Sequence, residues 1–436
     1  MAIAPPNTST SPTAVSSDAS TSYSGPLAVV TTLFFMWGFL TCLNDILVPH
    51  LKSIFDLNYT QVMLIQFAFF GAYFLFSIPS AKVIDWIGYQ KSMVVGLLTM
   101  GVGAFLFVPA ASVPSYPLFL GALIVLAAGI TLLQVAANPY VTVLGPARTA
   151  SSRLNLTQAF NSLGTFLAPF FGGLLILSAA PKAISDIRAL APDALQAYRL
   201  HEAATVKTPY VGLGIALILL AAAIGSFKLP KIPHAQHQIG EKVNDSIWKH
   251  PNLIFGAISI FVYVGAEVSI GSFLVNYFSQ PEIGGLTEKV AASFVAFYWG
   301  GAMVGRFIGS ALLQKVSTRR LLGICAVCAA ALVAISMLTT GHPAMWSIIA
   351  VGFFNSIMFP SIFTLGVAEL GPLTGDGSGI MIMAIVGGAL IPVAQGAIAD
   401  RIGIHHAFFL PVICYLYILF FALSGARPNS ERYAKT

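Results

Sequence analysis

The stretches NPYVTVLG (138–145) and FPSIFTLG (359–366) decide the fold of this chain, because they repeat the same helix-bending residues half a chain apart. Proline, leucine and glycine stand at matching positions in both, with a spacing of 221 residues. A second set repeats with a spacing of 223 residues: Gly164, Pro169 and Gly173, then Gly387, Pro392 and Gly396. Glycine and proline are frequent in membrane helices in any case, but six matched positions favour an internal duplication of the 436-residue chain.

The composition excludes most classes of soluble protein. Hydrophobic residues make up 57% of the chain and charged residues only 9%, whereas about a quarter of the residues in a soluble domain are charged. Soluble domains of this total length would need far more polar residues to cover their surfaces. The mean hydropathy of +0.83 indicates a protein dissolved mainly in lipid. Cytosolic enzymes and nucleic-acid-binding proteins are therefore excluded.

Twelve stretches are apolar enough to cross a membrane, which takes about 20 residues each. Their ranges are 26–48, 61–84, 91–111, 117–142, 153–178, 208–228, 252–278, 290–315, 319–340, 344–367, 377–399 and 404–424. The sequence thus predicts an all-α membrane protein with two pseudo-symmetric six-helix halves. The predicted parts are a disordered N-terminal tail (1–25), a six-helix bundle (26–228), a cytoplasmic linker (229–251), a second six-helix bundle (252–424) and a C-terminal tail (425–436). A short surface helix is expected from Asp186 to His201.

Basic residues predict how the chain crosses the membrane, because lysine and arginine collect in cytoplasmic loops. With both termini in the cytoplasm, fifteen of the 22 lysines and arginines fall on the cytoplasmic side and seven on the other. The formal charge of +6 reflects these loops rather than a polyanionic partner. We therefore expect a multi-pass inner-membrane protein with both termini in the cytoplasm.

Polar residues inside the predicted spans are the candidates for a binding site, since a charge at the centre of a span costs about 2.5–3.5 kcal/mol. They are Asn44, Asp45, Gln66, Gln134, Asn138, Asn155, Gln158, Asn161, Tyr263, Glu267, Asn276 and Asn355. Gln134 and Asn138 are four residues apart and share a helix face. Asn155, Gln158 and Asn161 follow at intervals of three residues and share another. Such residues persist in a membrane helix mainly when they face a cavity or a partner.

The chemistry of this set points to a neutral ligand rich in hydroxyl groups. Amides both donate and accept hydrogen bonds, and carboxylates accept them. Trp299 and Phe359 could stack on the C–H face of a sugar ring, and no large basic cluster lines the spans to attract an anion. Each amide could instead only join two helices, which is worth about 0.6 kcal/mol. The chain has no phosphate-binding loop and no metal-binding histidine motif, so neither ATP-driven transport nor a firm metal site is predicted.

Four stretches resemble the fucose/glucose–galactose permease family of the major facilitator superfamily. They are WGFLTCLNDILVPHLK (37–52), AANPYVTVLGP (136–146), RLNLTQAFNSLGTFLAP (153–169) and YVGAEVSIGSFLVNY (263–277). The resemblance implies the major facilitator fold and cation-coupled uptake of a monosaccharide across a bacterial inner membrane by alternating access. It also implies that Asp45 is a protonation site and that Gln158 and Asn161 contact sugar hydroxyls.

Two departures within this resemblance favour its glucose/galactose branch. Proton-coupled fucose members carry a glutamate where this chain has Gln134, and an amide where it has Glu267. The candidate coupling groups are therefore Asp45 and Glu267, with H⁺ or Na⁺ as the coupling ion and a possible Na⁺ site beside either acid. The remaining candidates for sugar contact are Asn44, Gln66, Gln134, Asn138, Tyr263, Asn276, Trp299, Asn355 and Phe359.

Several alternatives remain open at this point. The substrate could be fucose or an amino sugar, and the same architecture could export a lipophilic compound. A membrane enzyme or a sugar sensor is the alternative from another class, but no paired catalytic residues converge and no loop is long enough for an output domain. We expect no enzymatic activity and no cofactor. The expected partners are the lipid bilayer and a small neutral sugar, with the chain acting as a monomer.

Overall fold

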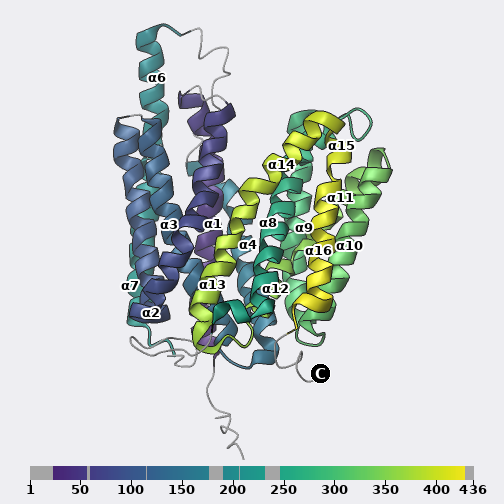
Figure 1. The fold of residues 1–436 in the computed structure, drawn as a ribbon. Coiled ribbons are helices and arrows are strands. Elements are labelled where there is room, and N and C mark those ends of the chain that lie inside the picture. Colours follow the sequence, from purple (N-terminus) through teal and green to yellow (C-terminus); the bar gives the residue numbers. More distant parts are fainter. Residues whose placement is uncertain are drawn as a thin grey trace, which may run out of the picture.

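The computed structural model describes residues 23–55, 59–113, 115–175, 190–205, 207–230 and 246–427, and these residues form helices and short connections without strands. Nine of their helical segments are long and apolar enough to cross a membrane. The predicted N-terminal tail up to residue 22 and linker residues 231–245 lie outside the described part. Two groups of helices stand side by side (Figure 1), as the predicted all-α fold of two halves requires.

The first group, called the N-bundle here, contains the helices before the linker. They are α1 (Ser24–Phe55), α2 (Tyr59–Ser112), α3 (Tyr116–Val143), α4 (Ala150–Leu175), α6 (Pro192–Thr205) and α7 (Lys207–Ser226). Helix α2 holds two predicted spans, which meet at Gly88 with φ 81° and ψ 168°. Glycine adopts such a backbone without the steric cost that other residues meet, so the two spans join without a loop.

The surface helix differs from its prediction. Helix α6 begins at Pro192 and ends at Thr205, whereas we expected a helix from Asp186 to His201. Proline at the first helical position fixes a suitable φ and lacks only a donor that would be unpaired there. Residues 186–189 lie outside the described ranges.

The second group, called the C-bundle here, follows the linker. It comprises α8 (Pro251–Phe278), α9 (Glu288–Leu312), α10 (Thr318–Leu338), α11 (Gly341–Asn355), α12 (Met358–Gly366), α13 (Thr374–Met383), α14 (Gly387–Ile402), α15 (Ile404–Ala407) and α16 (Phe409–Phe420).

Two of the C-bundle spans are broken helices. The span predicted at 344–367 breaks between Asn355 and Met358, and the span at 377–399 passes through a 3-10 turn at Ala384–Val386. The repeated prolines do not end their helices: Pro139 and Pro392 lie inside α3 and α14. Irregular backbone is tolerated at membrane depth where protein or a cavity surrounds it, so the break at Asn355 marks a place to look for a site.

The two bundles meet at one end of the molecule and diverge toward the other (Figure 1). At the meeting end α13 packs against α2 and α3, and α4 packs against α9 and α12. Hydrogen bonds cross between the bundles there, from Ser152 Oγ to the Ser310 carbonyl at 2.7 Å and from Ser378 Oγ to the Val135 carbonyl at 2.9 Å. We call this the closed end, which is the lower end in Figure 1, and the opposite end the open end.

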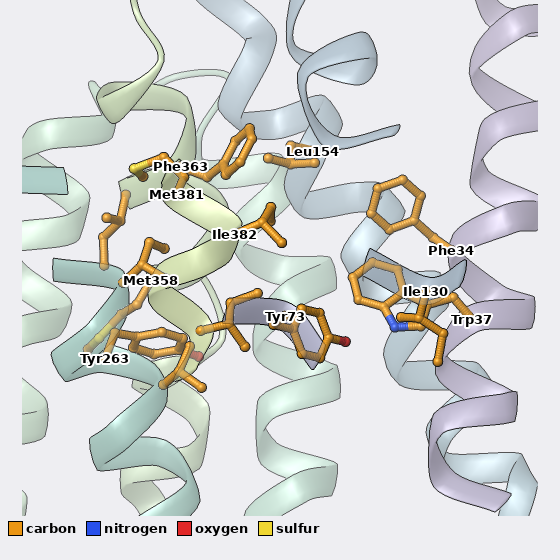
Figure 2. Close-up of a cluster of buried hydrophobic side chains, with 14 of the residues drawn as sticks. Phe34, Trp37, Tyr73, Ile130, Leu154, Tyr263, Met358, Phe363, Met381 and Ile382 are labelled. Atoms are coloured by element: carbon orange, nitrogen blue, oxygen red, sulfur yellow. The ribbon is translucent and has the colours of Figure 1, made fainter. Parts of the chain in front are cut away.

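Buried apolar side chains from both bundles meet in a shared layer (Figure 2). Phe34 and Ile130 of the N-bundle are fully buried, as are Met358 and Ile382 of the C-bundle. Tyr73 and Tyr263 lie in the same layer and carry the polar groups that begin the candidate site.

Candidate functional site

Helix α3 presents buried amides that lack partners. Gln134 and Asn138 are both buried, one helical turn apart as the sequence predicts. The Gln134 side chain donates from Nε2 to the Tyr73 hydroxyl at 2.7 Å. Within the described structure, Gln134 Oε1 and both amide atoms of Asn138 have no hydrogen-bond partner. A buried polar atom without a partner is costly, so this face is suited to a polar ligand.

The three amides of α4 have different surroundings, although their spacing predicts one shared face. Asn155 donates from Nδ2 to the Arg306 carbonyl of the C-bundle at 2.6 Å. Asn161 donates from Nδ2 to the Phe34 carbonyl of α1 at 2.9 Å. Gln158 lies between them and is buried, and its Nε2 has no partner among the described residues. Two of the three amides thus join helices, and Gln158 remains available to a ligand.

The C-bundle contributes a connected set of polar groups around the break at Asn355. The Tyr263 hydroxyl lies 2.8 Å from Glu267 Oε1 and 3.1 Å from the carbonyl of Asn355. Asn355 donates from Nδ2 to the Tyr298 hydroxyl at 2.9 Å. The break between α11 and α12 frees the Asn355 carbonyl from helical bonding, which lets it accept from Tyr263. The four side chains therefore hold one another in place.

Arg306 of α9 joins the two bundles beside this set. Its guanidinium donates from Nη1 to the Ser162 hydroxyl of the N-bundle and from Nε to the carbonyl of Ser356, the latter at 3.3 Å. The Ser356 carbonyl that it bonds is next to the Asn355 carbonyl, which accepts from Tyr263, the partner of Glu267. Arg306 falls within the predicted span 290–315, and no role is assigned to it from the sequence. The cost of a charge in a span was the signal that could have identified it.

Three further predicted residues are exposed or make other contacts. Asn276 is exposed on α8, nine residues and so about 13.5 Å beyond Glu267 toward the open end. The ring of Trp299 is 42% exposed and contacts the Tyr298 ring edge-on at 5.1 Å. Phe359 stacks on Phe363 at 6.1 Å. The Trp299 ring lies beside Gly271, one helical turn after Glu267 on α8, and the roles of Trp299 and Phe359 as aromatic platforms stay predictions.

The remaining predicted residues belong to described helices, but their side chains lie outside the described part. They are Asn44 and Asp45 on α1 and Gln66 on α2. Sequence reasoning also missed Gln395 of α14, which is fully buried and has no partner for either amide atom in the described chain. A glutamine inside a predicted span was the signal for it.

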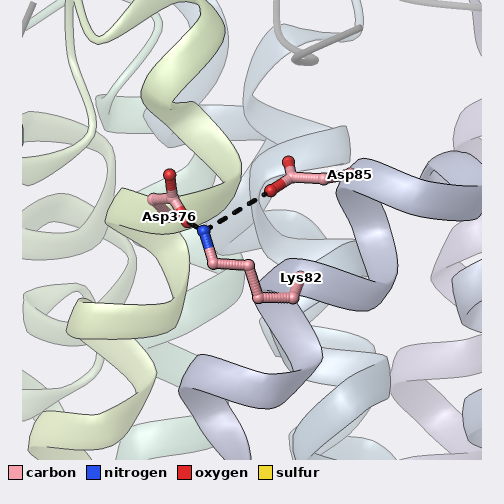
Figure 3. A network of polar contacts seen from close by, with 3 residues as sticks. All are labelled: Lys82, Asp85 and Asp376. Carbon is pink, nitrogen blue, oxygen red and sulfur yellow. Dashed lines mark hydrogen bonds and ion pairs between the residues drawn. The ribbon is translucent and has the colours of Figure 1, made fainter. Parts of the chain in front are cut away.

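An ion pair joins the bundles at the closed end (Figure 3). Lys82 Nζ lies 3.2 Å from Asp376 Oδ1 of the C-bundle and 3.9 Å from Asp85 Oδ2 of its own bundle. The Lys82 side chain is 54% exposed, so solvent weakens the attraction.

Similarity to known proteins shows the family to which this chain belongs. The model of the Major Facilitator Superfamily matches residues 28–385. The chain is 54% identical to a "Glucose/galactose transporter" of Brucella abortus over 93% of this chain and 95% of that protein. It is 36% identical to the "L-fucose-proton symporter" of Escherichia coli over 94% and 95% of the two chains. The crystal structure of the transporter FucP in the outward conformation matches with a TM-score of 0.86 at 34% identity, covering 93% of this chain and 99% of that one.

These matches agree with the family resemblance of the four sequence stretches and with the all-helical fold. The chain belongs to the major facilitator superfamily, in the branch that contains the fucose and glucose/galactose permeases.

Proposed function

We propose that this protein is a proton-coupled symporter of a neutral hexose of the glucose/galactose class, working by alternating access. The 54% identity to a glucose/galactose transporter supports the substrate class. The likeness to fucose-proton symporters supports a proton as the coupling ion. The bundles would rock about a site between them, as in related transporters.

The unpaired amides of the N-bundle are the observation that carries this proposal. Asn138 is fully buried and neither of its side-chain polar atoms has a partner in the described structure, and Gln158 Nε2 and Gln134 Oε1 share that condition. Amides that bound only neighbouring helices would have their hydrogen bonds satisfied. Sugar hydroxyls both donate and accept, so they are suited to satisfy amide oxygens and amide N–H groups alike. A lipophilic substrate would leave them unpaired, which argues against export of such a compound.

We assign sugar contact to Gln134, Asn138 and Gln158 of the N-bundle and to Asn355 of the C-bundle. Asn161 contributes by holding α4 against α1 through the Phe34 carbonyl. Asn44, Gln66 and Tyr263 remain proposed members of the site, whereas Asn276, Trp299 and Phe359 are not assigned to it. Glu267 is the proposed proton carrier in the C-bundle, and Asp45 of α1 is a second.

The closed end faces the cytoplasm in this proposal. Lys82, Lys91, Arg148 and Lys315 lie near that end, and basic residues favour the cytoplasmic side. The likeness to the outward conformation of FucP supports a site that is open toward the outside in the described structure. The inner membrane and cytoplasmic termini follow from the same assignment.

Reconstituted full-length protein tests the proposal directly. We would measure uptake of radiolabelled glucose, galactose, fucose, mannose and N-acetylglucosamine into proteoliposomes under an inward proton gradient, an inward Na⁺ gradient and no gradient. We expect glucose and galactose to accumulate above equilibrium only with the proton gradient. Accumulation driven only by a Na⁺ gradient would show that Na⁺ and not H⁺ is the coupling ion. Preferential accumulation of fucose would show that fucose is the substrate. No accumulation of any hexose would overturn the proposal.

A further inference from the structure

Arg306 makes two separate contacts with α4 of the opposite bundle. Its guanidinium donates to the Ser162 hydroxyl, and its backbone carbonyl accepts from Asn155 Nδ2. A third bond, from Nε to the Ser356 carbonyl, stays inside the C-bundle. We call these three bonds the Arg306 latch. Arg306 lies six residues before the end of α9 at the closed end, so the latch lies on the cytoplasmic side of Glu267 in the proposed orientation.

Opening of the closed end must break two of the three latch bonds. Ser162 and Asn155 move away with the N-bundle, whereas Ser356 and Arg306 move together because both belong to the C-bundle. A guanidinium carries five donors and a permanent charge, and a charge without a partner at membrane depth is costly. The side chain therefore needs a new acceptor within the C-bundle when the bundles separate.

Glu267 is the acidic group placed to be that acceptor. It belongs to the same bundle, and Tyr263, which bonds to Glu267, donates to the Asn355 carbonyl next to the Ser356 carbonyl that Arg306 bonds. No ion pair joins the two side chains in the described structure, where Lys82 pairs with Asp85 and Asp376. The current partner of the carboxyl group is the Tyr263 hydroxyl at 2.8 Å. Arginine binds carboxylates through paired, charge-assisted hydrogen bonds.

We infer that Arg306 is a positioning residue that exchanges Ser162 for Glu267 when the closed end opens, and thereby drives release of the coupling proton into the cytoplasm. The inference rests on the proposed function. In the release step the O–H bond of the Glu267 carboxylic acid breaks, the proton passes to water at the opened end, and the carboxylate pairs with the guanidinium. Closing the end restores the Ser162 bond and leaves Glu267 free to take a proton from outside.

Four other side chains surround Glu267 and affect whether its carboxyl group is charged. Tyr263 comes from its own helix, Tyr298 and Arg306 from α9, and Tyr415 from α16. Arg306 is the cation in this set. The three tyrosines stay uncharged at physiological pH, so the movement of Arg306 is the change that can favour the charged form of Glu267 in one conformation.

Three variants of the full-length protein in proteoliposomes separate the latch from a purely structural role. The readouts are sugar counterflow, which needs no net proton release, and accumulation driven by a proton gradient. We expect Arg306→Gln to keep counterflow and to lose accumulation by about tenfold, the size of a typical coupling between two sites. Raising the internal pH should restore accumulation in Arg306→Gln, because an alkaline interior removes the proton without the guanidinium.

Arg306→Lys keeps the charge and should retain part of the accumulation. Ser162→Ala removes the bond to the opposite bundle but keeps the guanidinium, so it should retain accumulation while favouring the inward-facing state. The inference is overturned if Arg306→Gln accumulates sugar like the wild type, or if Arg306→Gln and Arg306→Lys lose counterflow and accumulation equally without rescue by alkaline internal pH. Absence of proton-driven accumulation in the wild type would instead overturn the proposed function, and the latch with it.

Discussion

The polar groups of the two bundles differ in how far they bond to one another. On the N-bundle, Asn138 and Gln158 are buried with amide atoms that have no partner in the described structure. On the C-bundle, Tyr263, Glu267 and Asn355 are joined by bonds of 2.8 and 3.1 Å. The N-bundle amides therefore keep unused hydrogen-bonding atoms, whereas Tyr263, Glu267 and the Asn355 carbonyl already bond to one another. Asn355 Oδ1 and both amide atoms of Gln395 are C-bundle atoms that also lack a partner in the described structure.

This difference assigns separate tasks to the two bundles. A buried polar atom that lacks a partner costs about 1–3 kcal/mol, and a bound sugar would recover that cost. A connected network instead responds as a unit when one member changes charge. We interpret the N-bundle face as the part that recognises sugar and the C-bundle face as the part that couples sugar movement to the proton.

Glu267→Gln should have the largest effect on transport. If it does not, the C-bundle face is not the part that couples sugar movement to the proton. Glutamine keeps the size of the side chain and can still bond to the Tyr263 hydroxyl, but it cannot exchange a proton. We expect accumulation under a proton gradient to fall to the equilibrium level while counterflow of galactose persists. Asn276→Ala, which alters an exposed amide further along the same helix, is the matched control. Full accumulation in Glu267→Gln would move the coupling role to another acid, with Asp45 as the first candidate.

Asn138→Leu should weaken sugar binding without destabilising the protein. Leucine has a similar size and leaves no unpaired polar atom, so the free energy of unfolding should stay level or rise. Loss of hydrogen bonds to a sugar, each worth about 1 kcal/mol, should raise the dissociation constant about tenfold. Sugar binding by the purified variant and thermal unfolding in detergent measure the two quantities. A stability loss with unchanged affinity would show that Asn138 is a structural residue.

Tyr263→Phe should reduce the stability of the protein, in contrast to Asn138→Leu. The change removes the hydroxyl shared by Glu267 and the Asn355 carbonyl, which should lower the free energy of unfolding by about 1 kcal/mol. Tyr277→Phe is a control on the same helix, because the Tyr277 hydroxyl lies 2.9 Å from Ser336 Oγ away from the site. Both variants should unfold at lower temperature, but only Tyr263→Phe should change proton-driven accumulation. An equal loss of accumulation in both would remove Tyr263 from the network.

The fold could be predicted from the sequence because its signals are local or periodic. Apolar stretches of span length and the repeated glycines and prolines lie in the chain itself, and Gly88 falls between two predicted spans. The break after Asn355 has a local signal, because Pro360 has no N–H to bond the Ser356 carbonyl four residues before it. The bonds from Tyr263 and Arg306 to the Asn355 and Ser356 carbonyls could not be predicted in this way.

The site could be predicted only as a set of residue types. Spacing places Asn155, Gln158 and Asn161 on one face, but the helices packed against that face decide which amide is already paired. Arg306 was missed because its partner is a serine from the other bundle. Serine occurs throughout the chain and gives no signal of its own. Contacts between distant segments are the information that the sequence alone does not carry.

Lys82→Met should have the smallest effect, because Lys82 lies outside both the N-bundle face and the C-bundle face. It therefore tests whether either face extends to the closed end. Its ion pair with Asp376 joins the bundles at the closed end, but the lysine is 54% exposed, and such pairs contribute about 0–1 kcal/mol. Losing it should shift the balance toward the inward-facing state slightly, and high salt should give the wild type the same shift, since salt screens exposed charges. Accessibility of a cysteine introduced at the closed end measures that balance. Sugar affinity and proton coupling should stay unchanged, because neither Asn138 nor Glu267 contacts this pair; a loss of coupling in Lys82→Met would mean that the C-bundle network extends to the closed end.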